Sequence, residues 1–512
     1  MEEEIEDKNK KGEKLIQTEE SRDSGIELGR ISENTENTIR ENTGKKVSSL
    51  QTIFSIWNTM IGSTIISIPY NVYLAGIIPT IIFGLLYGFI CYFTCSIVVK
   101  LGGKEEEFAN VVFNYFSYSL GKNFGKFGRF LQITFNLMIN IGATFVYFLI
   151  INQNLFPCIC LLLGFFGIDL DADDITPYFS RFSLFYCALI ICIVIFPLTI
   201  LKEMRLLVKF NSYGIYFVSI LLLFVIYTGI SSLIKDTFHF EYKQNIEGDK
   251  NRYLLLFGEN INRLSGTLSL GLFCHSVILP LLKNNRKPEN NQRDLFLGYV
   301  CVTFTYIIIG IMGYIGFSGS EFSSTFHDNW FRFFKSDNYF ILVLRLLNVI
   351  QLSSIFPILF FVVRQQLFST FCESYINSKI HRVIFSLILF SLCIIVLYFF
   401  YDTLGDFISY LGASTALILV YTISPITNMI YYYMRHQTKK EVKLITNKMK
   451  SSISSEDQKP IFPEGLGEPV PLKPVKAFFF YLSMMLIVFL GIMTFVLQIV
   501  SVNFFKVKIQ KN

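Results

Sequence analysis

The chain has 512 residues, of which 52% are hydrophobic and 16% are charged, whereas about 25% are charged in typical soluble domains. This balance predicts a protein embedded in a lipid bilayer and excludes an ordinary soluble domain. The net charge of +6 is spread over loops between apolar runs, so no nucleic-acid partner is expected.

The N-terminal segment and the stretch after it differ sharply in charge. Residues 1–49 contain thirteen acidic and nine basic residues and no aromatic residue, which predicts a disordered cytosolic tail because such a composition cannot bury a core. From Val47 to Val99 there is no charged residue. This length predicts two membrane spans, since a spanning helix needs about 20 apolar residues.

Nine further apolar runs bring the predicted total to eleven spans. They lie at 130–157, 182–201, 210–234, 259–282, 295–317, 339–363, 383–400, 407–434 and 477–505. Residues 101–129 interleave basic residues with Phe and Tyr, which is typical of an interfacial helix. Basic residues gather in alternate loops, and this predicts a cytosolic N-terminus and a lumenal or external C-terminus.

These boundaries predict four segments: the tail at 1–49, a ten-helix core at 50–434, a cytosolic loop at 435–476, and an eleventh helix with a short noncytosolic end at 477–512. Most of the ten cysteines lie inside apolar runs, where they are packing residues. No Cys/His cluster has metal-ligand spacing, and no nucleophile–base set stands out. We therefore expect neither an enzyme nor a resident cofactor.

The first span is interrupted by polar and small residues at its middle. Asn58, Thr59, Gly62, Ser63 and Thr64 lie there, and a Gly–Ser pair is a common place for a helix to break. Broken backbone survives at membrane depth only around a cavity or inside protein. A half-helix that starts near Gly62 directs N–H groups to that place, and one that ends near Asn58 directs carbonyls to it. The alternative is a helix contact through small residues.

A similar pattern returns five helices later. Residues 58–69 read NTMIGSTIISIP and residues 265–280 read SGTLSLGLFCHSVILP. Equivalent helices of two five-helix units run in opposite directions. A pair of interrupted helices at matching positions of two inverted halves indicates the midplane site of a secondary transporter.

Three segments carry a resemblance to a known family. They are WNTMIGSTIISIPYNVYLAG (57–76), LLKNNRKPENNQRDL (281–295) and VTFTYIIIG (302–310). The chain resembles the amino acid/auxin permease family, and within it the sodium-coupled neutral amino acid transporters, most of all their lysosomal arginine-sensing branch. The resemblance implies an all-α polytopic fold with a leucine-transporter-like 5+5 inverted repeat plus an eleventh helix. It also implies amino acid transport, often with Na⁺.

The resemblance places the substrate at residues 58–63. An amino acid zwitterion needs N–H donors for its carboxylate and carbonyls for its ammonium, and a break at this place supplies both. The predicted substrate-binding residues are Asn58, Thr59, Met60, Ile61, Gly62 and Ser63.

In this fold a sodium ion commonly lies between the first and eighth helices. The eighth span contains Gln351, Ser353 and Ser354, and oxygen atoms are the ligands that hard cations prefer. Asn58, Ser353 and Ser354 are therefore the candidate sodium ligands. The two serines point about 100° apart on a helix, so only one is expected to bind. The alternative is that they are small packing residues.

Two ionisable residues lie within the spans. His275, at the predicted break of the sixth span, is either a titrating group that makes transport pH-dependent or a neutral, hydrogen-bonded core histidine. Arg345, in the eighth span, is expected to extend to the noncytosolic interface, because long basic side chains near helix ends reach for water.

The predicted function is secondary active transport of amino acids, including arginine, by alternating access. We expect Na⁺ as the coupling ion, with H⁺ as the other possibility, and a lysosomal, late endosomal or vacuolar membrane rather than the plasma membrane. One alternative is an amino acid sensor that signals through its tail, and a weaker one is a channel. The 49-residue tail has no recognisable counterpart of the branch's docking segment, so no signalling-complex partner is expected.

Overall fold

A computed structural model describes most of the chain. The described residues are 46–102, 107–168, 170–171, 182–235, 238–241, 252–317, 329–334, 339–371, 378–401, 404–436 and 474–509. Most of the predicted tail at 1–49 and of the predicted loop at 435–476, as well as residues 510–512, lie outside these ranges.

Nearly all of the described structure is helical. Eight helical stretches among the described residues are long and apolar enough to cross a membrane, which bears out the prediction of an all-α polytopic membrane protein. They are α4 (Ile77–Gly102), α6 (Lys122–Gly164), α8 (Met204–Lys235), α11 (Asn291–Phe317), α12 (Tyr339–Phe371), α13 (Lys379–Phe400), α17 (Pro474–Ile509), and the continuous run of α14 (Leu404–Ile418), the π-helix η4 (Leu419–Ile423) and α15 (Ser424–Arg435).

The remaining elements are shorter. The apolar helix α7 (Leu184–Thr199) and the two interrupted helices fill the other predicted spans. The connections contain α5 (Phe108–Leu120), the 3₁₀ turns η1 (Pro288–Asn290) and η2 (Trp330–Phe333), and the strands β1 (Phe238–Glu241) and β2 (Arg252–Leu255). The two strands pair in parallel between the predicted spans 210–234 and 259–282. Each predicted span thus contains helix, and the grouping into two inverted units stays a prediction.

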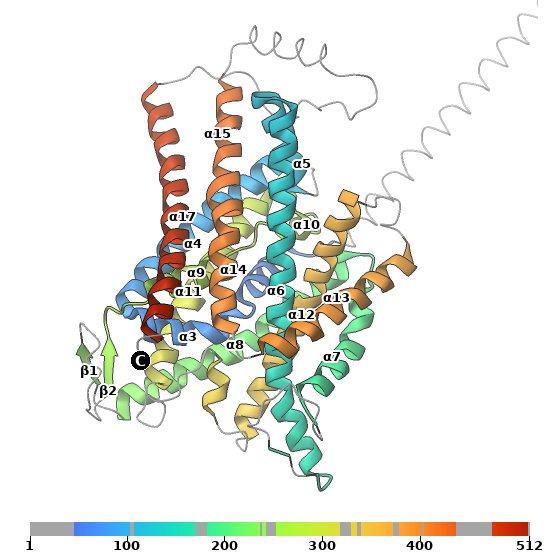
Figure 1. The fold of residues 1–512 in the computed structure, drawn as a ribbon, viewed down its shortest axis with the longest axis vertical. Coiled ribbons are helices and arrows are strands. Elements are labelled where there is room, and N and C mark those ends of the chain that lie inside the picture. The colour runs from blue at the N-terminus through green and yellow to red at the C-terminus, as the bar shows by residue number, and fades with distance from the viewer. Residues whose placement is uncertain are drawn as a thin grey trace, which may run out of the picture.

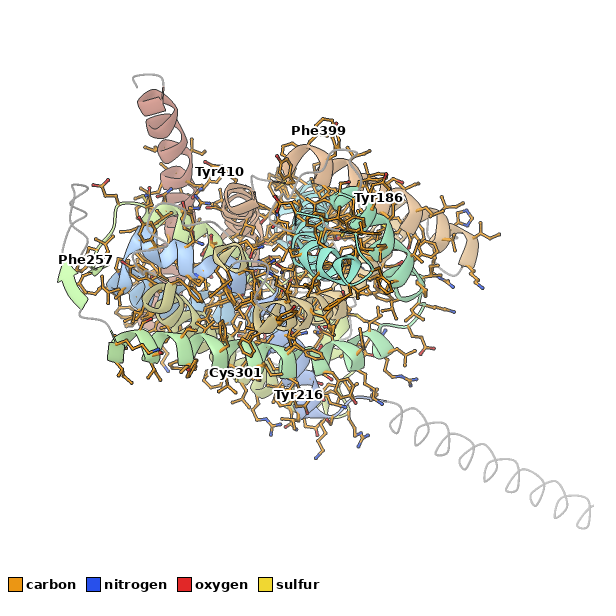
Figure 2. The ribbon with its side chains drawn as sticks, turned by 90° about the horizontal axis from the view of Figure 1, so that it is seen from below. Tyr186, Tyr216, Phe257, Cys301, Phe399 and Tyr410 are labelled. Carbon is orange, nitrogen blue, oxygen red and sulfur yellow. The ribbon has the colours of Figure 1, made fainter. Side chains whose placement is uncertain are left out.

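The helices differ strongly in direction. In Figure 1, α6, α14 with α15, and α17 run along the long axis, whereas α8 crosses the lower part of the molecule at a steep angle to them. α8 packs against α2, α11 and α12. Figure 2 labels Tyr216, Phe257 and Phe399 at the rim of the molecule, where they expose 59%, 41% and 68% of their surface. Large apolar side chains exposed in such numbers are expected of a surface that faces lipid.

The first predicted break is present at Gly62. Helix α2 (Ser49–Ile61) ends there and α3 (Thr64–Ala75) begins two residues later. Gly62 has φ +37°, a left-handed conformation that glycine adopts without a Cβ penalty. A Cβ at this position would overlap the hydroxyl of Tyr147 from α6. The glycine is therefore required both by the turn of the backbone and by the close approach of a neighbouring helix.

The second break lies in the later part of the 265–280 motif and includes His275, the residue predicted to lie at it. The motif's polar, glycine-containing part is helical and forms α9 (Ile261–Gly271), and the interruption at residues 272–277 precedes α10 (Ile278–Leu282). The small residues of α9 serve close packing instead of unwinding. A Cβ at Gly266 would come within 2.6 Å of Ser409 of α14, and one at Gly271 within 2.8 Å of Thr64 of α3.

Replacing Gly62 by alanine is expected to destabilise the protein. A left-handed conformation costs an L-residue about 1–2 kcal/mol, and the overlap with Tyr147 adds to this. Thermal unfolding in detergent should show a lower midpoint for Gly62→Ala. Gly164→Ala is the matched control, because a Cβ there meets nothing within 4 Å. Adding Tyr147→Phe should recover part of the loss, and an unchanged midpoint for Gly62→Ala would contradict the assignment.

Candidate functional site

The two helix breaks meet at one tyrosine hydroxyl. Tyr306 Oη of α11 lies 2.6 Å from Met60 O, 3.1 Å from Ile61 O and 3.2 Å from Gly271 O. These carbonyls belong to the last turns of α2 and α9. Carbonyls at the C-terminal end of a helix have no intrahelical hydrogen-bond donor. One hydroxyl carries one hydrogen and cannot satisfy three acceptors at once. The carbonyl ends of both broken helices therefore keep capacity to accept from a further donor, such as an ammonium group.

Two other tyrosines serve the same breaks. Tyr147 Oη lies 3.5 Å from Thr59 O, and Tyr299 Oη donates to Leu272 O at 3.1 Å. None of these three tyrosines is among the site residues predicted from sequence. The available signal was a tyrosine inside an apolar span, because a buried phenol needs a hydrogen-bond partner. Tyr306 even lies within the VTFTYIIIG segment (302–310).

The opposite end of the first break presents amides. Ser63 is the N-cap residue of α3, and its side chain makes no capping hydrogen bond. Ser63 and Thr64 are both buried, with 5% and 2% of their surface exposed. N–H groups at a helix start carry partial positive charge and favour an anion. This end can accept a carboxylate, a few residues from the carbonyls that can accept an ammonium group.

The predicted substrate residues divide between two places. The backbone of Met60 and Ile61 faces Tyr306, and Gly62 and Ser63 form the turn itself. The side chains of Asn58 and Thr59 point instead towards α8, where both contact Asn211. The structure therefore brings four of the six residues to the break and places two side chains in a separate polar cluster.

That polar cluster is centred on the Asn58 amide. Asn58 Nδ2 lies 2.7 Å from Asn211 Oδ1, 3.0 Å from Asn211 O and 3.1 Å from Ser354 Oγ. Gln351 Nε2 donates to Asn58 Oδ1 at 3.0 Å and so fixes the orientation of the amide. Asn58, Asn211 and Gln351 are fully buried. Their mutual hydrogen bonds offset the cost of removing polar groups from water.

Asn211 ties this cluster to the last turns of α2. Its Nδ2 lies 2.8 Å from Ser55 Oγ and 2.7 Å from Thr59 Oγ1. The close approach of α8 depends on Gly214, because a Cβ there would overlap the Asn58 amide. The sequence analysis did not single out Asn211, although an asparagine within an apolar span is itself a signal.

The two candidate sodium-ligand serines lie in different surroundings. Ser354 is buried and hydrogen-bonds within the cluster, whereas Ser353 is half-buried and takes no part in these contacts. The cluster supplies neutral oxygen atoms from Ser354 and Asn211, which is chemistry that suits a hard monovalent cation. Among the described residues, no group of three or more His, Cys, Asp and Glu side chains forms a transition-metal site.

Buried amides continue from the cluster towards the C-terminal end of α6 and the N-terminal end of α12. Gln351 Oε1 accepts from Asn348 at 3.3 Å, Asn348 Oδ1 accepts from Asn154 at 2.8 Å, and Asn154 Oδ1 lies 3.4 Å from the amide nitrogen of Asn329. The continuous network links the middle of the membrane to the turn η2. It also fixes α12 against α6 through paired amides instead of apolar contacts alone.

The prediction for Arg345 is wrong. The side chain does not extend to the interface but is buried, with 4% of its surface exposed. Its Nη2 donates to Phe331 O at 2.8 Å and to Phe334 O at 3.2 Å. The carbonyls of η2 lie within reach inside the protein, so they replace water as partners of the guanidinium.

His275 lies in the second break. Its Nε2 is 2.9 Å from the Thr94 hydroxyl of α4, and its ring stacks on Phe273 with centroids 5.2 Å apart. The Thr94 hydroxyl lies 2.9 Å from Ile90 O. Since it donates there, it accepts from His275, which places the proton on Nε2 and leaves Nδ1 as an acceptor. This arrangement matches the neutral core histidine among the two sequence-based alternatives.

Comparison with known proteins gives the relationships of the whole chain. A family model described as "Transmembrane amino acid transporter protein" matches residues 45–453. Neutral amino acid transporter 9 of Xenopus tropicalis is 27% identical over 78% of this chain and 77% of its own. Neutral amino acid transporter 9 of Rattus norvegicus is 28% identical over 77% and 75% of the two chains. The sodium-coupled neutral amino acid transporter 9 homolog of Caenorhabditis elegans is 25% identical over 75% and 68%.

Among solved structures, the chain is similar to Mhp1, a nucleobase-cation-symport-1 family transporter in a closed conformation with bromovinylhydantoin bound. The two chains are 10% identical and superpose with a TM-score of 0.48. The match covers 90% of this chain and 93% of Mhp1. The relatives are transporters and not enzymes, in agreement with the expectation from sequence. Because the family model matches most of the chain, the protein belongs to the transmembrane amino acid transporter family.

Proposed function

We propose that the protein is a secondary active transporter that binds an amino acid zwitterion between its two broken helices and moves it by alternating access. The observation that carries this proposal is the meeting of both breaks at the Tyr306 hydroxyl, which lies within 3.2 Å of carbonyls from α2 and α9. Such discontinuous helices at membrane depth are the usual place of substrate in secondary transporters.

The substrate carboxylate is held at the start of α3, by the N–H groups near Ser63 and Thr64. The ammonium group is held by the carbonyls of Thr59, Met60 and Ile61, in competition with the hydroxyls of Tyr147 and Tyr306. Recognition through the main chain is indifferent to the substrate side chain. The described residues of the two breaks, 62–63 and 272–277, include no acidic side chain, no Lys or Arg, and one histidine that the contacts above make neutral. A site without charge favours neutral amino acids.

We also propose arginine as a substrate and a lysosomal, late endosomal or vacuolar membrane as the location. Both rest on the family resemblance alone. The names of the relatives speak of neutral amino acids. A sensing role depends on the N-terminal tail, most of which lies outside the described residues. No observation favours that role over transport.

Sodium is the proposed coupling ion, and the cluster between α2, α8 and α12 is its proposed site. Asn58 and Ser354, two of the sequence-predicted ligands, lie together there with Asn211. The oxygen atoms of Ser354 and Asn211 accept from Asn58 Nδ2, so the proposed ion takes the place of that NH₂ group, and Asn58 itself binds the ion only when its amide turns over. The cluster contacts the last turns of α2 through Thr59. Occupancy of the ion site is thereby coupled to the helix end that holds the substrate, which is the physical requirement for symport.

Replacing Ser63 by tryptophan is expected to abolish uptake while the protein remains folded. The side chain would fill the buried space at the start of α3, where the substrate carboxylate is held. Uptake of radiolabelled amino acids into proteoliposomes measures this, with counterflow stimulation to distinguish a carrier from a channel. Ser63→Thr keeps the hydroxyl and is the matched control. Normal uptake by a properly inserted Ser63→Trp protein would contradict the proposed site.

The adjacent serines provide a paired test of the ion site. Ser354→Ala removes one ligand oxygen and should weaken the binding free energy of Na⁺ by about 1–1.5 kcal/mol. The Na⁺ concentration for half-maximal uptake should therefore rise about tenfold. Ser353→Ala should leave it unchanged, because that hydroxyl is outside the cluster. Asn58→Ala should abolish Na⁺-dependent uptake. Equal effects of the two serine variants, or uptake indifferent to Na⁺, would refute this ion site.

A further inference from the structure

A cavity lies away from the substrate site, between α5, α6 and α12. Its volume is about 760 Å³, and its lining includes Lys122, Lys126 and Arg129 together with Phe130, Met138 and Phe371. None of its lining residues is acidic. The cavity therefore joins a basic end to an apolar end, and neither belongs to the site described above.

The basic end is concentrated on one face of one helix. Lys126 and Arg129 are three residues apart, and Lys122 precedes Lys126 by four, so all three side chains lie on the same side of α6. Three positive charges at these spacings give this face of α6 a positive potential, which attracts anions. The same end is the N-terminus of the 43-residue helix α6. Its N-cap residue is Gly121, which has no side chain to accept from the first N–H groups of the helix. The helix dipole therefore adds to the positive potential.

The apolar end extends into the membrane. From Lys122 to Met138 the lining residues span sixteen steps of α6, or about 24 Å at 1.5 Å per residue. This is close to the thickness of one leaflet with its headgroup region, about 20–22 Å. Phe130 and Met138 expose 63% and 39% of their surface, so this end is open to acyl chains. An apolar surface of this kind would not contribute to the binding of a small soluble anion.

We propose that this cavity binds an anionic phospholipid, with a phosphorylated headgroup at Lys122, Lys126 and Arg129 and an acyl chain along Phe130 and Met138. Basic pockets between transmembrane helices on the cytosolic side are suited to such headgroups. Loop charges predict that this end of α6 is cytosolic. The lipid contacts α6 and α12, which also carry Tyr147 and Ser354, so its binding is expected to affect the helices that hold the substrate and ion sites.

Direct binding tests the proposal independently of transport. Purified full-length protein in detergent is titrated with dioctanoyl phosphatidylinositol 4,5-bisphosphate, and bound lipid is counted by native mass spectrometry. The triple variant Lys122→Gln, Lys126→Gln, Arg129→Gln should weaken binding by about tenfold to a hundredfold, the size expected from three basic residues at a charged headgroup. The control variant Lys202→Gln, Lys209→Gln, Lys287→Gln removes the same charge elsewhere and should change the affinity less than twofold.

Further arms separate the lipid from a free anion and from loss of fold. Met138→Trp fills the apolar end and should weaken lipid binding with all three charges present, while inositol trisphosphate should bind weakly to every variant. Dioctanoyl phosphatidylcholine should not compete. Size-exclusion profiles and thermal unfolding report folding, and Lys126→Gln alone replaces the triple variant if that one fails to fold. Equal lipid binding by the site and control variants, or equally tight binding of inositol trisphosphate, would overturn the proposal.

Discussion

The need to satisfy backbone groups at membrane depth governs this structure. Two helices end within the protein, and each ending leaves carbonyl oxygens without intrahelical partners, which lipid cannot supply. The Tyr306 hydroxyl lies beside carbonyls of both endings, at 2.6–3.2 Å. Because it can donate to only one of them, the site is stable in the membrane yet not saturated. A ligand that brings its own N–H donors can therefore compete for the remaining carbonyls.

The amide cluster solves a second problem, which is how to fix α2, α8 and α12 together without buried charge. Asn58, Asn211 and Gln351 bind one another in a fully buried place, and neutral amides avoid the desolvation cost of an ion pair. The cluster touches the end of α2 through Thr59. A change at the cluster is thus passed to the helix break through one or two residues, as the proposed coupling of ion and substrate requires.

The amide network and the basic cavity both involve the helices α6 and α12. α6 and α12 are tied together by buried amides from Gln351 to Asn154, and at their other ends they flank the basic cavity near Lys126 and Phe371. Arg345 joins the network's far end by binding the carbonyls of η2. The pair of helices therefore connects both membrane faces to the site. The proposed lipid at one end and the turn η2 at the other both contact this pair of helices.

Composition and pattern alone determined the class of the protein, its helical spans and the break at Gly62, because hydropathy and a Gly–Ser pair act locally. Tertiary structure decided the rest. Tyr306 and Asn211 are separated from Asn58 by more than 150 residues in sequence, so no local pattern reveals them as partners. Which serine faces Asn58 depends on the rotation of α12, and Arg345 is buried because η2 offers carbonyls nearby. Small residues of α9 pack helices closely, so the second break falls after them, at a place set by neighbouring helices.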